Sequence, residues 1–221
     1  MLQPHSDHRS KFVAEIKQDI QALARRLHYR ENSSDVYVVG NSLDFDYVAQ
    51  SIIDLVGTNL AGAATFWPKP AGISALTGNQ MFAVTQEFVG NCDRKKPDLL
   101  FCQACIGSSR ETIAMVSRVL DCLPVHDILI AAIHIADDVR SELETYFADD
   151  ILASVKVISL NQFSATIAAA YQYQAAYYSK FEEALGDTMS GLPKRFLFQI
   201  LGKSKPTTSA HRTLKSGPSP V

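Results

Sequence analysis

The sequence predicts a single-domain α/β protein, a three-layer sandwich in which helices cover both faces of a five-stranded parallel sheet of the flavodoxin-like or Rossmann-like kind. Short apolar runs alternate along the chain with longer amphipathic segments, as strands alternate with helices in such folds. The 221 residues, 47% of them hydrophobic and 20% charged, are enough to bury a full core. A long helical segment towards the C-terminus completes this prediction.

The distribution of charge predicts three parts of the chain. We expect an N-terminal arm over residues 1–9, the α/β domain over 10–190 and a basic, disordered tail over 191–221. The chain has a net charge of −2 and no Asp or Glu after Asp187, whereas the tail carries Lys194, Arg195, Lys203, Lys205, Arg212 and Lys215. Such a tail can contact an acidic partner or nucleic acid, or it can simply be a solvated end. The acidic body argues against nucleic-acid binding elsewhere.

Each element of the first half has its own signal. Apolar residues at helical spacing predict helices, and short apolar runs that end at Gly or Pro predict strands. Gly40 ends the first strand, and Gly57 ends the helix that follows it. The expected elements are a helix over 10–28, a strand over 36–39, a helix over 47–55, a strand over 61–66 and a helix over 80–90.

The second half repeats the same alternation. Ser108 or Ser109 can cap the helix that follows the third strand. The expected elements are a strand over 99–104, a helix from about 109, a strand over 128–133, a helix over 137–147, a strand over 155–160 and a long helix over 163–185. Parallel sheets of this kind bind ligands at the carboxyl ends of their strands, near the point where the strand order reverses. We therefore expect a site at the loops after Val39 and Ala104.

The segments from Gly40 to Gly57, over residues 73–107 and over residues 155–185 together resemble the sugar-isomerase (SIS) domain family, in particular phosphoheptose isomerases and the DnaA initiator-associating protein. The segment from Gly40-Asn41-Ser42 to Gly57 is similar to the GNGGS loop and its helix. Residues 73–107 are similar to the central segment, in which a turn, a helix and a strand lead to a serine-rich STSGNS loop. Residues 155–185 are similar to the last strand and long helix. The resemblance covers residues 10–186.

This resemblance implies a site for a sugar phosphate, held by hydroxyl groups and by backbone N–H groups at helix starts. The positions that match the family's cradle are Asn41, Ser42, Gly107, Ser108, Ser109 and Thr112. Two departures weaken it: the serine-rich loop has lost hydroxyl groups at residues 104–106, and Asp44 stands where the family has a serine. A carboxylate at that point repels a phosphate, although Asp44 can also be a simple helix cap.

The resemblance also implies that catalysis has been lost. The family's glutamate corresponds to Asp54, the one candidate catalytic base, whereas functional residues of the last helix correspond to Ala165, Ala168 and Ala176. No histidine lies on that helix and no zinc cage can be drawn, so we expect no metal and no cofactor. The chain is therefore predicted to be a catalytically degenerate phosphosugar-binding protein with a binding or regulatory role.

Two other functions stay open. The first is an active sugar-phosphate isomerase, acting on a substrate of the sedoheptulose 7-phosphate type, that uses Asp54 and an unrecognised acid. The second is a phosphoribosyltransferase-like protein, because the order of strand, loop, helix and strand has a similar rhythm. That class needs adjacent acidic residues at the end of the third strand, where this chain has Ala104 and Cys105, and its last helix is shorter.

The sequence gives further expectations about partners and location. Small and aromatic residues along the last helix predict a homodimer or homotetramer, and a protein partner is also possible. No signal peptide and no apolar run of membrane-spanning length is present, so we expect a cytoplasmic protein with no membrane contact and reduced thiols. Cys102 and Cys105 have CxxC spacing but lie in an apolar run without a second ligand pair.

Overall fold

The computed structural model describes residues 4–27, 35–56, 60–75, 80–92, 94–150 and 154–185. These ranges contain five helices and six strands. In chain order they are α1 (Pro4–Leu27), β1 (Val36–Asn41), α2 (Ala49–Val56), β2 (Leu60–Ile73), β3 (Gln80–Val89), β4 (Asp98–Ile106), α3 (Ser109–Leu120), β5 (Asp127–Ala136), α4 (Asp137–Asp150), β6 (Ser154–Phe163) and α5 (Ile167–Leu185). The predicted basic tail over 191–221 lies outside the described residues.

The strands form one sheet in the order β3-β2-β1-β4-β5-β6. β2, β1, β4, β5 and β6 run parallel to their neighbours, and β3 pairs antiparallel with β2 at the edge. The α/β class is therefore confirmed, but the sheet has six strands where five were predicted. The chain moves outward from β1 to β2 and in the other direction from β4 to β5, so the order reverses between β1 and β4. The loops after these two strands meet at that point.

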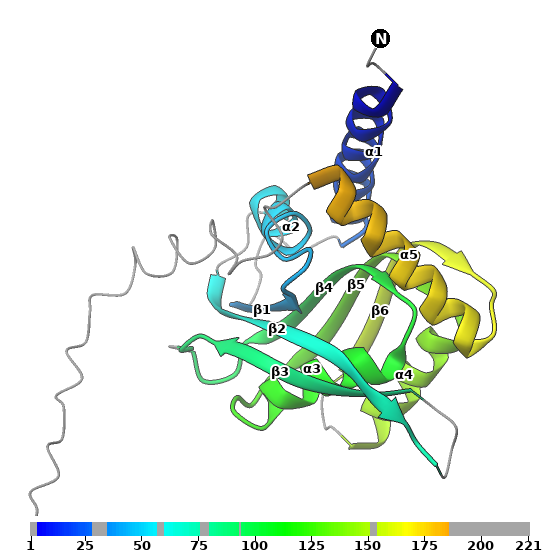
Figure 1. Ribbon diagram of the computed structural model, residues 1–221. Helices are drawn as coiled ribbons and strands as arrows, with labels where there is room; N and C mark the ends of the chain where they lie inside the picture. The colour runs from blue at the N-terminus through cyan, green and yellow to red at the C-terminus, as the bar shows by residue number, and fades with distance from the viewer. Residues whose placement is uncertain are drawn as a thin grey trace, which may run out of the picture.

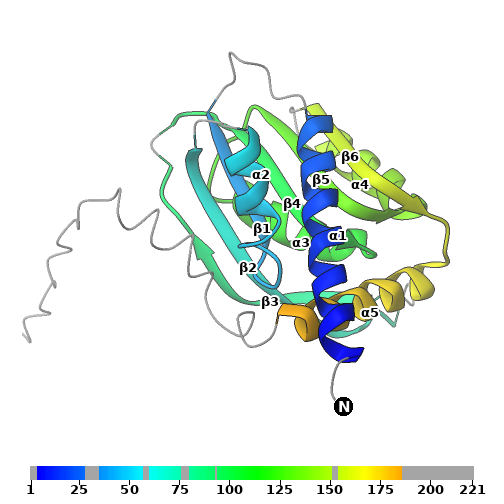
Figure 2. The ribbon, with the colours of Figure 1, turned by 90° about the horizontal axis from the view of Figure 1, so that it is seen from above.

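Helices lie on both faces of the sheet and bury two separate cores. One core joins residues of α1 and α2 to one face of β1, β4 and β5. The other joins residues of α3 and α4 to the opposite face. In Figure 2, α1 and α2 lie in front of the sheet, with α3 and α4 behind it. The central strands β1 and β4 are buried on both faces, which explains their continuous apolar sequences.

β2 and β3 form a long hairpin, the arm, which reaches beyond the other strands (Figure 1). Pro68 and Pro70 lie within β2, and the pairing with β3 shifts register beside each of them, since proline has no N–H group to donate. The expected helix over 80–90 is wrong, because these residues form β3. Met81, Phe82, Ala83 and Val84 alternate between exposed and half-buried, which is the period of a strand.

α5 crosses the carboxyl edge of the sheet and contacts both cores (Figure 1). Ala170 belongs to the core of α3 and α4, whereas Tyr178 and Phe181 belong to the core of α1 and α2. The Phe12 ring of α1 lies 5.9 Å from that of Tyr177, centroid to centroid. Within the described ranges, no helix combines the length and the apolar character needed to cross a membrane.

Candidate functional site

The candidate site is the crevice at the carboxyl ends of β1 and β4, where the strand order reverses. Asn41 at the end of β1 and Asp44 in the loop after it lie there, and the loop after β4 brings Gly107 and the first turn of α3. In an open doubly wound sheet a ligand occupies this place. Here it is occupied by α5, whose Gln174 and Tyr178 side chains point into it and bond to both loops.

Gln174 closes one half of the crevice with two hydrogen bonds. The Gly107 N–H donates to Gln174 Oε1 at 2.6 Å, and Gln174 Nε2 donates to Glu111 Oε2. Glu111, in the first turn of α3, also accepts a bond from Asn41 Nδ2 at 3.1 Å. The backbone is equally close, because a Cβ atom on Gly107 would lie 2.2 Å from the Ala170 carbonyl oxygen. The space directly beside Gly107 is therefore filled by α5.

Asp44 closes the other half. Its Oδ2 accepts bonds from the Ala104 N–H and from the Tyr178 hydroxyl, both at 2.6 Å. Asp44 is completely buried, and its Oδ1 has no partner within the described part of the chain. A buried carboxyl group held by two donors fixes the loop after β1 against both β4 and α5.

Burial sets the protonation of both carboxyl groups. It raises the pKa of Asp44 to about 7, although the bonds from Tyr178 and Ala104 act in the opposite direction. Burial likewise raises the pKa of Glu111 to about 7; the nearby Asp44 adds to this, and the bonds from Gln174 and Asn41 oppose it. Neither acid is exposed, so neither is presented to a substrate.

The residues predicted to hold a phosphate are brought to the same edge of the sheet, but most of their donors are used inside the protein. Asn41 donates to Glu111, and the Gly107 N–H donates to Gln174. Ser109 donates its hydroxyl to Glu142 Oε2. The N–H of Ser42 bonds to the Phe66 carbonyl at 2.8 Å. Thr112, another of the predicted residues, is fully buried, and its hydroxyl has no partner among the described residues.

Ser108 differs from these residues. It is the N-cap of α3, but its side chain makes no capping bond. It lines a cavity of about 510 Å³ between the loop after β4, α4 and the start of α5, although its exposed fraction is only 8%. Within the described part of the chain, the Ser108 hydroxyl therefore makes no capping bond and lies beside the closed crevice.

The candidate base Asp54 lies apart from the crevice. It is exposed on α2, accepts a bond from Gln50 Nε2 at 2.8 Å and lines neither of the two large cavities. The family positions on the last helix are also misplaced, because Ala168 and Ala176 are exposed. The buried stripe of α5 consists of Ala170, Gln174, Tyr178, Phe181 and Ala184.

Three residues that close the crevice were missed by sequence reasoning: Glu111, Gln174 and Tyr178. Glu111 follows Ser108 by three positions, a spacing typical of a capping box. The sequence therefore suggests a helix cap for Glu111 and gives no sign of its contact with α5. Gln174 gives the clearer signal, since it is a polar residue one turn after Ala170 and one turn before Tyr178 on the buried face of a helix. A buried amide at such a position needs partners, which are Glu111 and Gly107.

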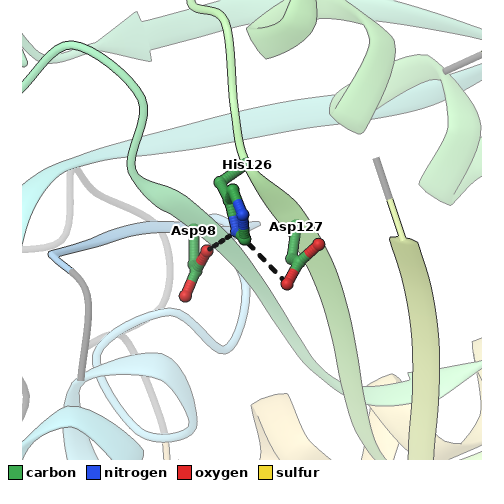
Figure 3. Close-up of side chains that lie close together, drawn as sticks. All are labelled: Asp98, His126 and Asp127. Carbon is green, nitrogen blue, oxygen red and sulfur yellow. Dashed lines mark hydrogen bonds and ion pairs between the residues drawn. The ribbon is translucent and has the colours of Figure 1, made fainter. Parts of the chain in front are cut away.

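A second charged cluster lies at the opposite edge of the sheet, at the amino ends of β4 and β5 (Figure 3). His126 Nδ1 is 3.2 Å from Asp98 Oδ1 and 3.3 Å from Asp127 Oδ2. These three side chains could also surround a metal ion by their spacing, but the His126 side chain is 64% exposed. We interpret the cluster as a polar contact that joins the starts of two strands.

No protein-family model and no curated protein sequence matches the chain. Similar solved structures include a hypoxanthine phosphoribosyltransferase from Staphylococcus aureus, with 14% identity, 66% of this chain and 74% of that chain covered, and a TM-score of 0.44. Adenine phosphoribosyltransferase from Thermoanaerobacter pseudethanolicus has 15% identity, coverages of 70% and 84%, and a TM-score of 0.40. The enzyme of the same name from Leishmania tarentolae has 9%, 66% and 70%, and 0.43.

The resemblance to sugar isomerases is wrong. The similar solved structures named above are phosphoribosyltransferases. The structure itself disagrees with the resemblance, because the central segment of that family contains a helix where this chain has strand β3. The expected phosphosugar-binding and isomerase functions, which followed from the resemblance, are withdrawn with it.

Proposed function

We propose that this chain is a non-catalytic binding protein with a phosphoribosyltransferase-like sheet, and that its own helix α5 occupies the crevice in which a substrate would lie. One observation carries the proposal: Gln174 and Tyr178 take up the hydrogen-bonding groups of the crevice. A transferase must leave the N–H groups of its phosphate loop free for the phosphate. In this chain a side-chain oxygen of α5 accepts the Gly107 N–H instead.

The chemistry of the loop after β4 supports the same proposal. The adjacent acids that the phosphoribosyltransferase class needs are replaced by Ala104 and Cys105, and both are buried with no exposed area. Burial raises the pKa of the Cys105 thiol, so it stays protonated and is a poor nucleophile. The buried acids nearby, Asp44 and Glu111, are engaged by Tyr178 and Gln174.

A second candidate is the binding of a small anion beside the crevice. The observation that favours it is Ser108, whose hydroxyl makes no capping bond among the described residues and which lines a cavity of about 510 Å³ at the N-terminus of α3. A helix start stabilises negative charge through its N–H groups. This candidate requires no transfer reaction and is compatible with a closed crevice.

The proposal is tested by incubating the full chain with phosphoribosyl pyrophosphate, Mg²⁺ and either adenine or hypoxanthine, and by measuring the release of pyrophosphate. We expect release no faster than in the absence of protein. Turnover by the wild-type chain that Glu111→Gln abolishes would contradict the proposal. For the second candidate, calorimetry with inorganic phosphate is compared between the wild type and Ser108→Ala, and equal binding by both excludes a Ser108 site.

Location and partners also belong to this proposal. All four cysteines are free thiols, which suits a reducing compartment, and we place the protein in the cytoplasm. A protein without an open crevice acts through its surface, so its partners are expected to be proteins rather than substrates.

A further inference from the structure

We propose that a groove between the arm, α3 and α4 is the interface between two copies of this chain. The groove consists of two adjoining cavities that share Ser109, Arg110 and Glu142. One has a volume of about 880 Å³ and lies between β3, α3 and α4. The other, of about 510 Å³, lies between the arm, the loop after β4 and the start of α5. Below, this surface is called the α3–α4 groove.

Exposed apolar side chains are concentrated in this groove. The described residues include five large hydrophobic side chains with high exposure. Four of them line the groove: Ile73, Met81, Tyr146 and Ile167, with exposed fractions of 68%, 45%, 41% and 47%. Scattered exposed apolar residues are ordinary, but a contiguous set around a hollow marks an interaction surface.

The charges of the groove favour a second copy as its occupant. Arg110 is exposed and makes no hydrogen bond or ion pair with the described residues. Glu142, its counterpart across the groove, is held by the Ser109 hydroxyl. In a two-fold interface residue i of one copy meets residue j of the other, and j meets i. A patch that carries one free cation and one carboxylate among its described residues is therefore complementary to itself, whereas a partner of one charge would satisfy only one of them.

The groove is also held in shape before any association. The Phe82 ring on the arm lies 5.7 Å from the Tyr171 ring on α5, centroid to centroid. Arg118 of α3 forms two bonds, of 2.7 and 2.8 Å, with Glu87 of β3. These contacts tie the arm to α5 and α3, so association does not have to order the arm. Apolar side chains that surround a complementary pair of charges suit a specific interface, because the charges fix the register in which the two copies meet.

Sedimentation velocity of the full chain is the first test, at protein concentrations from about 1 to 100 μM, which spans the Kd of weak and moderate dimers. We expect a dimer. Arg110→Glu and Glu142→Arg should each be monomeric, because each places like charges opposite one another twice. An equimolar mixture of these two variants should recover the dimer. In the mixed pair the two reversed charges face each other, and Arg110 of one copy still faces Glu142 of the other.

Controls distinguish the groove from other causes. Glu144→Arg reverses a charge on α4 next to the groove, where Glu144 pairs with Arg140, and should remain dimeric. Circular dichroism of every variant checks that it is folded, and Tyr146→Asp provides a second disruption if Glu142→Arg is not. A wild type that stays monomeric up to the highest concentration overturns the proposal. So does a dimer that persists in Arg110→Glu and Tyr146→Asp, or a mixture that stays monomeric. Neither result bears on the closed crevice.

Discussion

The crevice under α5 and the α3–α4 groove lie side by side at the carboxyl edge of the sheet, and they are opposites. The crevice is rich in polar groups and closed, with Asp44 and Glu111 bonded internally. The groove is rich in apolar groups and open, with Arg110 unpaired in the described structure. The crevice at the carboxyl ends of β1 and β4, where such folds bind ligands, is here part of the protein interior, and the neighbouring surface has the composition of an interface. The comparison teaches that position in a fold does not by itself determine what a site does.

The largest expected effect comes from Gly107→Ala, which displaces α5 from the crevice by a steric clash. The new methyl group would lie 2.2 Å from the Ala170 carbonyl oxygen, so α5 has to move. We expect the free energy of unfolding to fall by about 3 kcal/mol, as for an overpacked core. Urea unfolding measures the loss, and hydrogen exchange over residues 167–185 shows whether α5 has loosened. Ser164→Thr, which adds one methyl group at an exposed site just before α5, is the control. Equal stability of the two variants would contradict close contact at Gly107.

The next effect is that of Gln174→Ala, which removes the polar link without adding volume. Glu111 and the Gly107 N–H then each lose a buried partner. A loss of about 2 kcal/mol in urea unfolding is expected from unsatisfied buried groups. Gln172→Ala on the same helix is the matched control, because Gln172 is exposed, and it should change stability by less than about 0.5 kcal/mol. Similar losses in both variants would contradict a specific role of the Gln174 contacts, because alanine is a better helix former than glutamine and neither substitution weakens the helix itself.

A graded effect is expected from pH, because two buried acids bind protons differently in the folded and the unfolded chain. Burial raises the pKa values of Asp44 and Glu111 from their ordinary values to about 7. The folded state therefore keeps protons that the unfolded chain has released, so stability is full at low pH and falls as pH rises from about 4 through about 7. Each carboxyl group contributes a slope of up to about 1.4 kcal/mol per pH unit in that window.

The groups that face these acids do not titrate there, because the pKa values of Tyr178, Cys102 and Cys105 are raised and Gln174 and Asn41 are neutral. Urea unfolding at pH 5, 6 and 7 measures the slope, and Glu111→Gln should reduce it. Because burial lowers the pKa of His134 and so gives a stability that rises with pH, the difference between the wild type and Glu111→Gln is the decisive quantity; equal slopes in both would contradict a raised pKa of Glu111.

The smallest effect is expected at the amino edge of the sheet. His126→Ala removes the exposed contacts to Asp98 and Asp127 and should cost less than about 0.5 kcal/mol, since exposed ion pairs contribute little. Thermal unfolding provides the measurement. If the loss instead depends on added Zn²⁺ or Mn²⁺, the cluster is a metal site and our interpretation of it is wrong.

The alternation of strands and helices could be predicted from the sequence because it depends on local patterns. The buried runs of β1 and β4 and the amphipathic stripes of α3 and α5 have clear periods. The hairpin of β2 and β3 could not be predicted in the same way. Pro68 and Pro70 normally break a strand, and only the antiparallel partner β3 keeps the chain extended through them. The place of the candidate site, at the loops after Val39 and Ala104, could be predicted from the fold class. Its individual residues depended on a resemblance in spacing, which cannot reveal that Gln174 lies against Gly107.

The position of α5 has a consequence for how the molecule assembles during synthesis. The hydrogen bond from Tyr178 to Asp44 joins residues 134 positions apart, and α5 follows every strand of the sheet in the sequence. Contacts of such long range form late, because closing a long loop costs entropy before it gains anything. We therefore expect a nascent chain that has completed β6 but not α5 to have an open crevice in which Asp44 and Glu111 are solvated. In that interval, before residues 167–185 are synthesised, the chain should resemble a protein with a vacant pocket.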